Sequence, residues 1–229
     1  MDFYYTDLET CEAATGTVIL IDVLRAFSTA AYAFACGAKE ILLVSTVEEA
    51  LSLKAEFPGS KAMGEVGGAP PPGFDFGNSP THIRQEDLSG VTLIQRTGAG
   101  TQGAVRSRNA DVMLAASFVV AGATARYVSA LRIDEVTFVI TGKWDDRGDE
   151  DLACAEYLEA LLRGDPIHTE PLIRRVHTSR DGLLHLDPHQ KIFPQSDLDY
   201  CTQIDRFDFA MPITREDVNL IMRAVKPSY

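Results

Sequence analysis

The chain has 229 residues, of which 45% are hydrophobic and 24% charged, so it is long enough to bury a sizeable core. Its formal net charge of −12 excludes the basic face that nucleic acid requires. No apolar run approaches the roughly 20 residues that cross a bilayer, and residues 1–5 lack the basic region and apolar core of a signal peptide. We therefore expect a cytoplasmic protein with no nucleic acid and no membrane partner.

Strand-like and helix-like segments alternate over the first two thirds of the chain, which predicts an α/β fold with a mainly parallel sheet. The predicted strands cover 17–21, 40–45, 60–65, 91–96, 112–116 and 135–141. The predicted helices cover 28–36, 47–57, the segment from the 97–101 turn to 108, 119–131 and 150–163.

Prolines interrupt the pattern after Gly164, where the chain becomes less regular. Short helices are predicted at 172–177 and 197–204, a closing strand at 207–211, and a final helix with Thr214 as its cap. We expect one domain over 1–229, with a motif-bearing core over 1–163 and a helical annex over 164–229.

The segment 17–29 combines a strand buried on both faces with an acid and a base, three residues apart, at its carboxyl end. Ser28 and Thr29 stand where the N-cap of the next helix belongs. Ligands of open α/β sheets bind beyond the carboxyl ends of strands, where helix N-termini present free N–H groups. Asp22 is therefore placed to hold a metal ion, and Arg25 to hold an anion. A plain salt bridge between Asp22 and Arg25 is the structural alternative.

Later turns repeat this arrangement, and their polar groups would converge in a parallel sheet. The second turn carries Glu65 and, downstream, Asp75 and Asn78. The last two lie in a Gly- and Pro-rich loop from 66 to 80. A loop of this length inside a compact domain is often a lid or binding loop, and a surface loop or an arm that contacts a partner subunit is the alternative.

The third turn, Thr97-Gly98-Ala99-Gly100-Thr101, is glycine-rich and opens a helix. Its backbone N–H groups can surround an oxyanion, and either threonine can add a hydroxyl. It lacks the Gly-Lys-Ser/Thr ending of a P-loop and the full dinucleotide spacing. A plain tight turn is the alternative.

The fourth turn, 145–151, places Glu150 and Asp151 in the first turn of a helix, where their charges suit the macrodipole. A magnesium site is the alternative to that structural role, because this hard cation takes a few carboxylates, water and substrate oxygens.

The cysteines and histidines show no spacing typical of a metal or redox site. Cys36 and Cys154 fall in helical apolar patterns, as small core residues do. We expect the five histidines to be surface residues, since Pro188 spoils the helical face that His185 and His189 would share. A strongly acidic chain repels anions unless a metal ion and a few arginines reverse the local field.

Taken together, these motifs resemble the 2-phosphosulfolactate phosphatase family. The resemblance covers roughly residues 15–163 and follows the family's order. It rests on Asp22 to Thr29 (Asp-Val-Leu-Arg-Ala-x-Ser-Thr), Gly64-Glu65, Pro72 to Pro80, Gly100-Thr101 and Glu150 to Leu152. It implies a three-layer α/β/α fold, here with a mainly parallel or mixed sheet and a less regular C-terminal part. The activity implied is Mg²⁺-dependent hydrolysis of 2-phospho-3-sulfolactate to sulfolactate and phosphate, a step toward coenzyme M.

Two departures from the family pattern remove polar groups. The chain has Gly98 and Ala99 where the family has threonine and asparagine, and Val120 where the family has another asparagine. A site built around a polar group discriminates strongly by that group. The alternatives are therefore a phosphatase for a different phosphorylated acid, or a non-catalytic anion-binding module.

The resulting hypothesis gives each group a role against a small anionic phosphoester. The catalytic residues are Asp22, Arg25 and Glu65. The substrate-binding residues are Ser28, Thr29, Asn78, Arg96, Thr97, Gly98, Gly100 and Thr101. The Mg²⁺ ligands are Asp22, Glu65, Asp75, Glu150 and Asp151. The nucleophile is a metal-bound water, or Asp22 through an aspartyl-phosphate. The proline loop and the large apolar fraction are compatible with a homodimer.

Overall fold

The alternating patterns of the sequence fold into a mixed α/β structure. The computed structural model describes residues 1–142 and 148–227. The strands are β1 (Asp2–Asp7), β2 (Gly16–Ile21), β3 (Glu40–Val44), β4 (Lys61–Gly64), β5 (Thr92–Arg96), β6 (Ala110–Ala116), β7 (Glu135–Ile140), β8 (Met211–Glu216) and β9 (Asn219–Met222). The α-helices are α1 (Ala26–Ala35), α2 (Val47–Glu56), α3 (Pro80–Ile83), α4 (Gly100–Arg106), α5 (Ala121–Ala130), α6 (Asp149–Arg163), α7 (Thr169–Thr178), α8 (Arg180–Leu186) and α9 (Gln195–Cys201). Short 3-10 helices are η1 (Cys11–Ala13) and η2 (Phe118–Val120). None of the helices in these two ranges is long and apolar enough to cross a membrane.

Within the described residues, nine strands form one sheet in the order β1-β7-β2-β6-β8-β9-β3-β5-β4. Strands β1, β7, β2 and β6 are mutually parallel, and so are β3, β5 and β4. The C-terminal hairpin β8–β9 stands between these two groups and pairs antiparallel with β6 and with β3. The prediction of a mainly parallel or mixed sheet is confirmed, and the hairpin supplies the mixed part.

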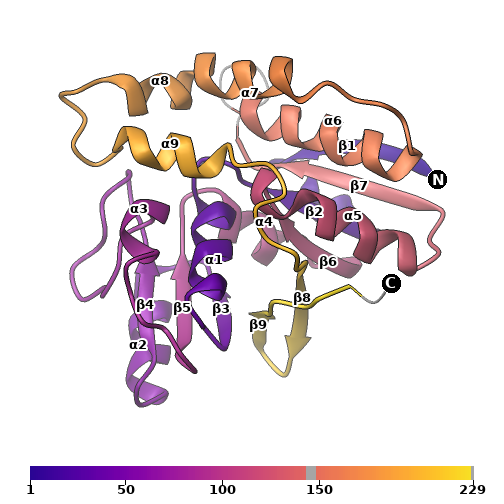
Figure 1. Ribbon diagram of the computed structural model, residues 1–229. Helices are drawn as coiled ribbons and strands as arrows, with labels where there is room; N and C mark the ends of the chain where they lie inside the picture. The colour runs from indigo at the N-terminus through magenta and orange to yellow at the C-terminus, as the bar shows by residue number, and fades with distance from the viewer. Residues whose placement is uncertain (143–147, 228–229) are drawn as a thin grey trace.

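The hairpin changes the direction of the sheet between its two parallel groups. Three successive antiparallel pairings, β6–β8, β8–β9 and β9–β3, give β3 the opposite sense to β6. Neighbouring strands are also rotated by roughly 20–25° through the twist of the sheet, and over the five pairings from β2 to β5 this exceeds a right angle. Figure 1 shows β7 crossing the view while β4 and β5 run up it. The carboxyl ends of β2, β7, β4 and β5 therefore converge, although the sheet is not parallel throughout.

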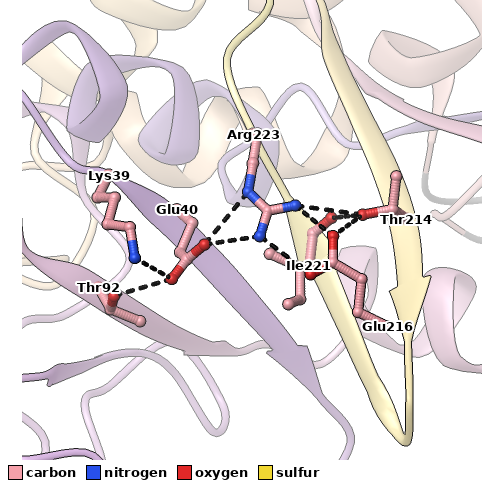
Figure 2. Close-up of polar contacts among 7 residues, drawn as sticks. All are labelled: Lys39, Glu40, Thr92, Thr214, Glu216, Ile221 and Arg223. Atoms are coloured by element: carbon pink, nitrogen blue, oxygen red, sulfur yellow. Dashed lines mark hydrogen bonds and ion pairs between the residues drawn. The ribbon is translucent and has the colours of Figure 1, made fainter.

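A network of charged and hydroxyl groups attaches the hairpin to β3 (Figure 2). Arg223, directly after β9, donates to Glu40 of β3 at 2.8 and 3.2 Å and also pairs with Glu216 of β8. Lys39 and Thr92 donate to the other oxygen of Glu40, each at 3.1 Å. Burial acts to raise the pKa of Glu40, but the hydrogen bonds from Arg223, Lys39 and Thr92 outweigh it and lower the pKa. The last strands of the chain are thus held in the middle of the sheet.

Side chains of β2 alternate between the two faces of the sheet, as expected for a continuous apolar strand with helices on both sides. Val18 and Leu20 pack in one core with residues of α1 and α4, whereas Ile19 and Ile21 pack in a second core with α5 and α6. All four side chains are fully buried. In the other parallel group, Leu42 packs with α2. Helices cover both faces, so the three-layer α/β/α arrangement is confirmed.

The C-terminal part differs in detail from its predicted elements. Helices α7, α8 and α9 lie together along the upper side of Figure 1, which confirms a helical region after Gly164. The predicted final helix is wrong, because its expected cap Thr214 lies inside β8, and the predicted strand at 207–211 begins at Met211. Residues 217–218, inside the predicted helix, form the turn of a hairpin instead. Asp217 adopts the left-handed conformation, with φ of 52°, that such turns need and that aspartate tolerates.

Candidate functional site

A cavity of about 640 Å³ lies where the carboxyl ends of β2, β4, β5 and β7 converge. Its lining comes from segments that are far apart in the chain. The predicted site residues in this lining are Asp22, Arg25, Glu65, Asn78, Thr97 and Gly98. Thr141 and Gly142, at the end of β7, complete this side.

Asp22 follows β2 directly and begins the first of the converging turns. Its Oδ1 accepts a hydrogen bond from the backbone N–H of Ala26 at 2.8 Å, so this side chain caps α1. The predicted N-cap position of Ser28 and Thr29 is wrong, because both lie in the first turn of that helix. The Ser28 hydroxyl donates to the carbonyl oxygen of Val23 at 2.8 Å. Ser28 and Thr29 are fully buried outside the cavity lining, so they support the helix from within.

The carboxylate of Asp22 is confined between two helix starts. Burial raises its pKa to about 6, and the negative charges of Glu65 and Asp181 add to the increase. Hydrogen bonds from the N–H groups of Ala26 and Gly100 act in the opposite direction. A Cβ atom on Gly100 would lie 2.8 Å from Oδ2 of Asp22, so the close approach of α4 requires glycine.

Arg25 binds the C-terminal part of the chain and is 4% exposed. Its Nη1 donates to Oδ2 of Asp197 and to the carbonyl oxygen of Ile192, both at 2.9 Å. Its Nη2 donates to the carbonyl oxygen of Gly68 at 3.4 Å. The salt bridge with Asp22 that the sequence allowed is not formed between these two described residues. Arg25 instead joins the β2 turn to two loops at the rim of the cavity.

Glu65 follows β4 and connects two turns through its carboxylate. Its Oε2 accepts from the N–H of Gly68 at 2.8 Å, and its Oε1 accepts from the N–H of Gly98. The preceding Gly64 has φ of 137°, and a Cβ atom there would lie 1.8 Å from the carbonyl oxygen of Arg96. The side chain of Arg96 donates to the carbonyl oxygen of Glu65 at 2.7 Å and lies outside the cavity lining. Arg96 therefore positions Glu65 and does not face the cavity.

The two threonines of the glycine-rich turn after β5 hold it closed. The N–H of Thr97 donates to Oγ1 of Thr101 at 2.9 Å, and the N–H of Thr101 donates to Oγ1 of Thr97 at 3.1 Å. Thr97, Gly98 and Ala99 line the cavity, whereas Thr101 is fully buried outside the lining. The N–H of Gly98, which was predicted to bind an oxyanion, already binds the carboxylate of Glu65.

The Gly- and Pro-rich loop after β4 brings one of its two predicted ligands to the cavity. Asn78 lines the cavity, is 7% exposed, and its Oδ1 has no hydrogen-bond partner among the described residues. Asp75 lies outside the lining, where its Oδ2 accepts from the N–H of Ala62 at 2.8 Å and pairs with Lys54 at 2.7 Å. Asn78 thus offers an acceptor to a ligand, whereas Asp75 fastens the loop to β4 and α2.

Glu150 and Asp151, in the first turn of α6, are buried and are not part of the cavity lining. Oδ1 of Asp151 accepts from the N–H of Val23 at 2.8 Å, and Oδ2 accepts from the N–H of Gly142 at 3.1 Å. Burial raises the pKa of Asp151 well above its ordinary value, and the charge of Glu150 adds to this. Burial also raises the pKa of Glu150 to about 7, with a further increase from Asp181. Asp151 thus joins the ends of β2 and β7 to α6.

The parts of the chain that the structure describes contain no preformed metal site, in the sense of three or more His, Cys, Asp or Glu side chains close enough to hold one ion. Of the five predicted ligands, only Asp22 and Glu65 line the cavity. Within the fourth predicted turn, residues 145–147 lie outside the described residues.

The cavity has a further wall that the sequence analysis missed, formed by α8 and the loop after it. Arg180, Asp181, Leu184 and His185 lie on one face of α8 and line the cavity together with Phe193. His185 is 4% exposed, so its prediction as a surface residue is wrong. The i, i+4 spacing of Asp181 with His185 and of Arg180 with Leu184 is the signal that could have found this face.

The arrangement is that of an α/β protein that binds a small ligand at the carboxyl ends of its strands. Three carboxylates, two arginines and the amide of Asn78, whose Oδ1 has no partner among the described residues, line one cavity, so the site can hold a cation and an oxyanion side by side.

Comparisons with known proteins agree with this class. A family model described as 2-phosphosulpholactate phosphatase matches residues 4–216. The chain belongs to the 2-phosphosulfolactate phosphatase family, as its motifs indicated. A relative from Bacillus subtilis, named probable 2-phosphosulfolactate phosphatase, is 36% identical over 209 residues, which are 90% of this chain and 91% of the relative. A relative of the same name from Thermotoga maritima is 32% identical over 200 residues, 83% of this chain and 86% of the relative.

Proposed function

We propose that the protein hydrolyses 2-phospho-3-sulfolactate to sulfolactate and phosphate, the step toward coenzyme M that its family implies. Membership of the family and the names of the relatives support this substrate. The observation that carries the proposal is the gathering of Asp22, Arg25, Glu65 and Asn78, from three separate turns and loops, around one cavity.

Mg²⁺ is the cofactor that this proposal includes, and the donor set fits it. Oδ1 of Asn78, a residue of the cavity lining, is a buried oxygen without a partner among the described residues. Mg²⁺ takes oxygen ligands, commonly one or two carboxylates with water and substrate phosphate oxygens. Asp22, Glu65 and Asn78 are the residues that would hold it in the cavity. When bound, it stabilises the charge that develops on the transferring phosphoryl group.

The charge of the cavity lining also favours a bound cation. Among the described lining residues, three carboxylates (Asp22, Glu65 and Asp181) face two guanidinium groups (Arg25 and Arg180), which leaves the lining net negative. The proposed substrate carries a phosphate, a carboxylate and a sulfonate. Repulsion between these anionic groups and the lining would oppose binding of the substrate. A divalent cation bound in the cavity would make the electrostatic contribution to binding favourable.

Arg25 is suited to bind the phosphoryl group because it is held in place beforehand. Its bonds to Asp197, Ile192 and Gly68 use part of the five N–H donors of the guanidinium. The group lines the cavity, so its other donors can reach a phosphoryl oxygen. A donor that is already oriented stabilises the transition state without reorganisation during the reaction.

Two nucleophiles are consistent with this geometry, a water molecule or the carboxylate of Asp22. Transfer to Asp22 would form an aspartyl-phosphate that water then cleaves. A single turnover in H₂¹⁸O distinguishes them. If ¹⁸O appears in the carboxylate of Asp22 after turnover, water did not attack the substrate directly. If no ¹⁸O appears there, an aspartyl-phosphate that water cleaves at its carbonyl carbon is rejected. An aspartyl-phosphate that water cleaves at phosphorus leaves no label in the carboxylate, and it is detected instead by acid quench as a phosphorylated protein.

Phosphate release from 2-phospho-3-sulfolactate, with and without Mg²⁺, tests the proposed function. We expect turnover only with Mg²⁺, and a strong loss in Glu65→Gln but not in Glu170→Gln, whose carboxylate is exposed on α7. Faster release from 2-phospholactate or 2-phosphoglycerate would assign another phosphorylated acid, in line with the missing side chains at Gly98 and Ala99. Phosphate binding with no turnover of any of these esters would identify a non-catalytic anion-binding module.

A further inference from the structure

The cavity wall on α8 is fixed at the start of the helix. Oγ of Ser179 accepts from the N–H of Gly182 at 3.0 Å and donates to the carbonyl oxygen of Val176 at 2.9 Å. A Cβ atom on Gly182 would lie 2.0 Å from that carbonyl oxygen, so glycine lets α7 and α8 meet closely. His185, one turn from Asp181 on the cavity face, therefore has a fixed backbone position.

Within residues 1–142 and 148–227, one of the two imidazole nitrogens of His185 has a hydrogen-bond partner. Nδ1 lies 3.0 Å from the carbonyl oxygen of Pro194, and the ring packs edge-on against Phe193 with 5.5 Å between ring centroids. A carbonyl oxygen only accepts, so Nδ1 carries the hydrogen and Nε2 carries the lone pair of the neutral ring. Burial lowers the pKa of His185 below its ordinary value, which favours that neutral form.

Charged groups from three parts of the chain act on this ring. Arg25, before α1, favours the neutral ring, whereas Asp197 on α9 and Asp181 on α8 favour the protonated one. Arg25 and Asp197 are paired with each other at 2.9 Å and act on the ring in opposite directions. The hydrogen bond with Pro194 also raises the pKa of His185, but burial is the largest cause and the net direction is downward.

Two of the three carboxylates in the cavity lining, those of Asp22 and Glu65, already accept hydrogen bonds from the backbone; the third, Asp181, lies one turn from His185 on α8. Oδ1 of Asp22 accepts from Ala26, and the two oxygens of Glu65 accept from Gly68 and Gly98. Nε2 of His185 has no donor among the described residues. A neutral imidazole with its lone pair unused is the side chain best suited to take a proton near pH 7.

We propose that Nε2 of His185 is the general base that takes a proton from the water molecule attacking phosphorus. This rests on the proposed phosphatase function with water, and not Asp22, as the nucleophile. One O–H bond of water breaks and its proton moves to Nε2, while the water oxygen forms a bond to phosphorus. The ester P–O bond breaks, and its electron pair goes to the oxygen of sulfolactate. The imidazolium then gives its proton to that oxygen, which restores the neutral ring and yields the hydroxyl of the product.

His185→Asn tests the proposal with little disturbance of the fold. The asparagine amide can donate to Pro194 from the position of Nδ1, and nothing replaces Nε2. We expect kcat for 2-phospho-3-sulfolactate with Mg²⁺ to fall by about 100-fold or more, with KM changed less than about threefold. His189→Asn, an exposed histidine four residues further along, is the matched control and should keep wild-type kinetics.

Chemical rescue separates a base from a structural residue. Imidazole added to His185→Ala should restore phosphate release in proportion to its free-base concentration, and substituted imidazoles of higher pKa should restore more. His185→Gln, which fills the same space without a base, should stay as slow as His185→Asn at a melting temperature close to that of wild type.

Three results would overturn the assignment. One is a His185→Asn protein that keeps more than a third of the wild-type kcat. Another is a His185→Ala protein, shown to be folded by circular dichroism, that does not respond to imidazole. The third is wild-type protein that releases no phosphate from 2-phospho-3-sulfolactate, which would reject the proposed function as well. Wild-type turnover combined with either of the first two results rejects only the role of His185.

Discussion

Arg25 and Asp197 form an ion pair at 2.9 Å in which neither side chain is more than 4% exposed, although 172 positions separate them in the chain. The same carboxylate accepts from the hydroxyl of Ser79 at 2.7 Å and from the N–H of Thr81 at 3.0 Å. One side chain of α9 thus joins the β2 turn and the loop before α3. The C-terminal helices are held to the rim of the cavity by this contact.

Loss of the Asp197 charge should destabilise the protein strongly. In Asp197→Asn, Arg25 stays buried without its counter-ion, and removal of one partner of a buried pair costs about 3–5 kcal/mol of unfolding free energy. Urea denaturation measures this change. Asp208→Asn removes the partner of Arg126 in an exposed ion pair and should cost less than about 1 kcal/mol. Similar small losses in both variants would contradict the role of Asp197 as the anchor of α9.

Gly100→Ala should reduce activity more than stability. The added methyl group would lie 2.8 Å from Oδ2 of Asp22 and 2.9 Å from Cβ of Ala26, so the carboxylate has to move. We expect kcat/KM to fall at least about tenfold, since small displacements of a reacting group reduce rate steeply. Gly77→Ala is the control, because the atoms nearest to a Cβ there belong to Pro70, at 3.7 Å or more. Wild-type kinetics in Gly100→Ala would show that Asp22 does not need its present position.

Stability without Mg²⁺ should fall as pH rises from about 4.5 to about 7. The pKa of Glu150 is raised from 4.5 to about 7 in the folded protein, first by burial. In this window the unfolded chain has released a proton that the folded protein keeps, so each pH unit lowers the free energy of unfolding by up to about 1.4 kcal/mol. Denaturation at several pH values should give a smaller slope for Glu150→Gln, and an unchanged slope would contradict the buried position of this carboxyl group.

The turns after β2, β4 and β5 could be predicted because each is a local pattern. The end of a strand is indicated within a few residues by each of three patterns: the continuous apolar run followed by Asp22, the Gly64-Glu65 pair, and the glycine-rich turn after Arg96. Their convergence was predicted for the wrong reason, however. The sheet is not parallel throughout, and its twist across the β8–β9 hairpin brings the strand ends together.

The partners of these residues could not be predicted from local patterns. Arg25 was expected beside Asp22, three positions away, but it pairs with Asp197. His185 was expected at the surface because Pro188 spoils the helical face that it would share with His189, whereas its burial depends on the packing of α8 against α9. Contacts between segments that are distant in the chain decided both positions.

The central claim is that separate strand ends form one site for a divalent cation and a phosphoester. A crystal soaked with Mn²⁺, which accepts the same oxygen ligands as Mg²⁺, and with phosphate tests this most directly through the anomalous signal of manganese. We predict a manganese peak in the cavity, coordinated by oxygen atoms of Asp22, Glu65 and Asn78, with phosphate between the metal and Arg25. Manganese bound only outside the cavity, for example at Asp75, or phosphate remote from Arg25, would contradict the claim.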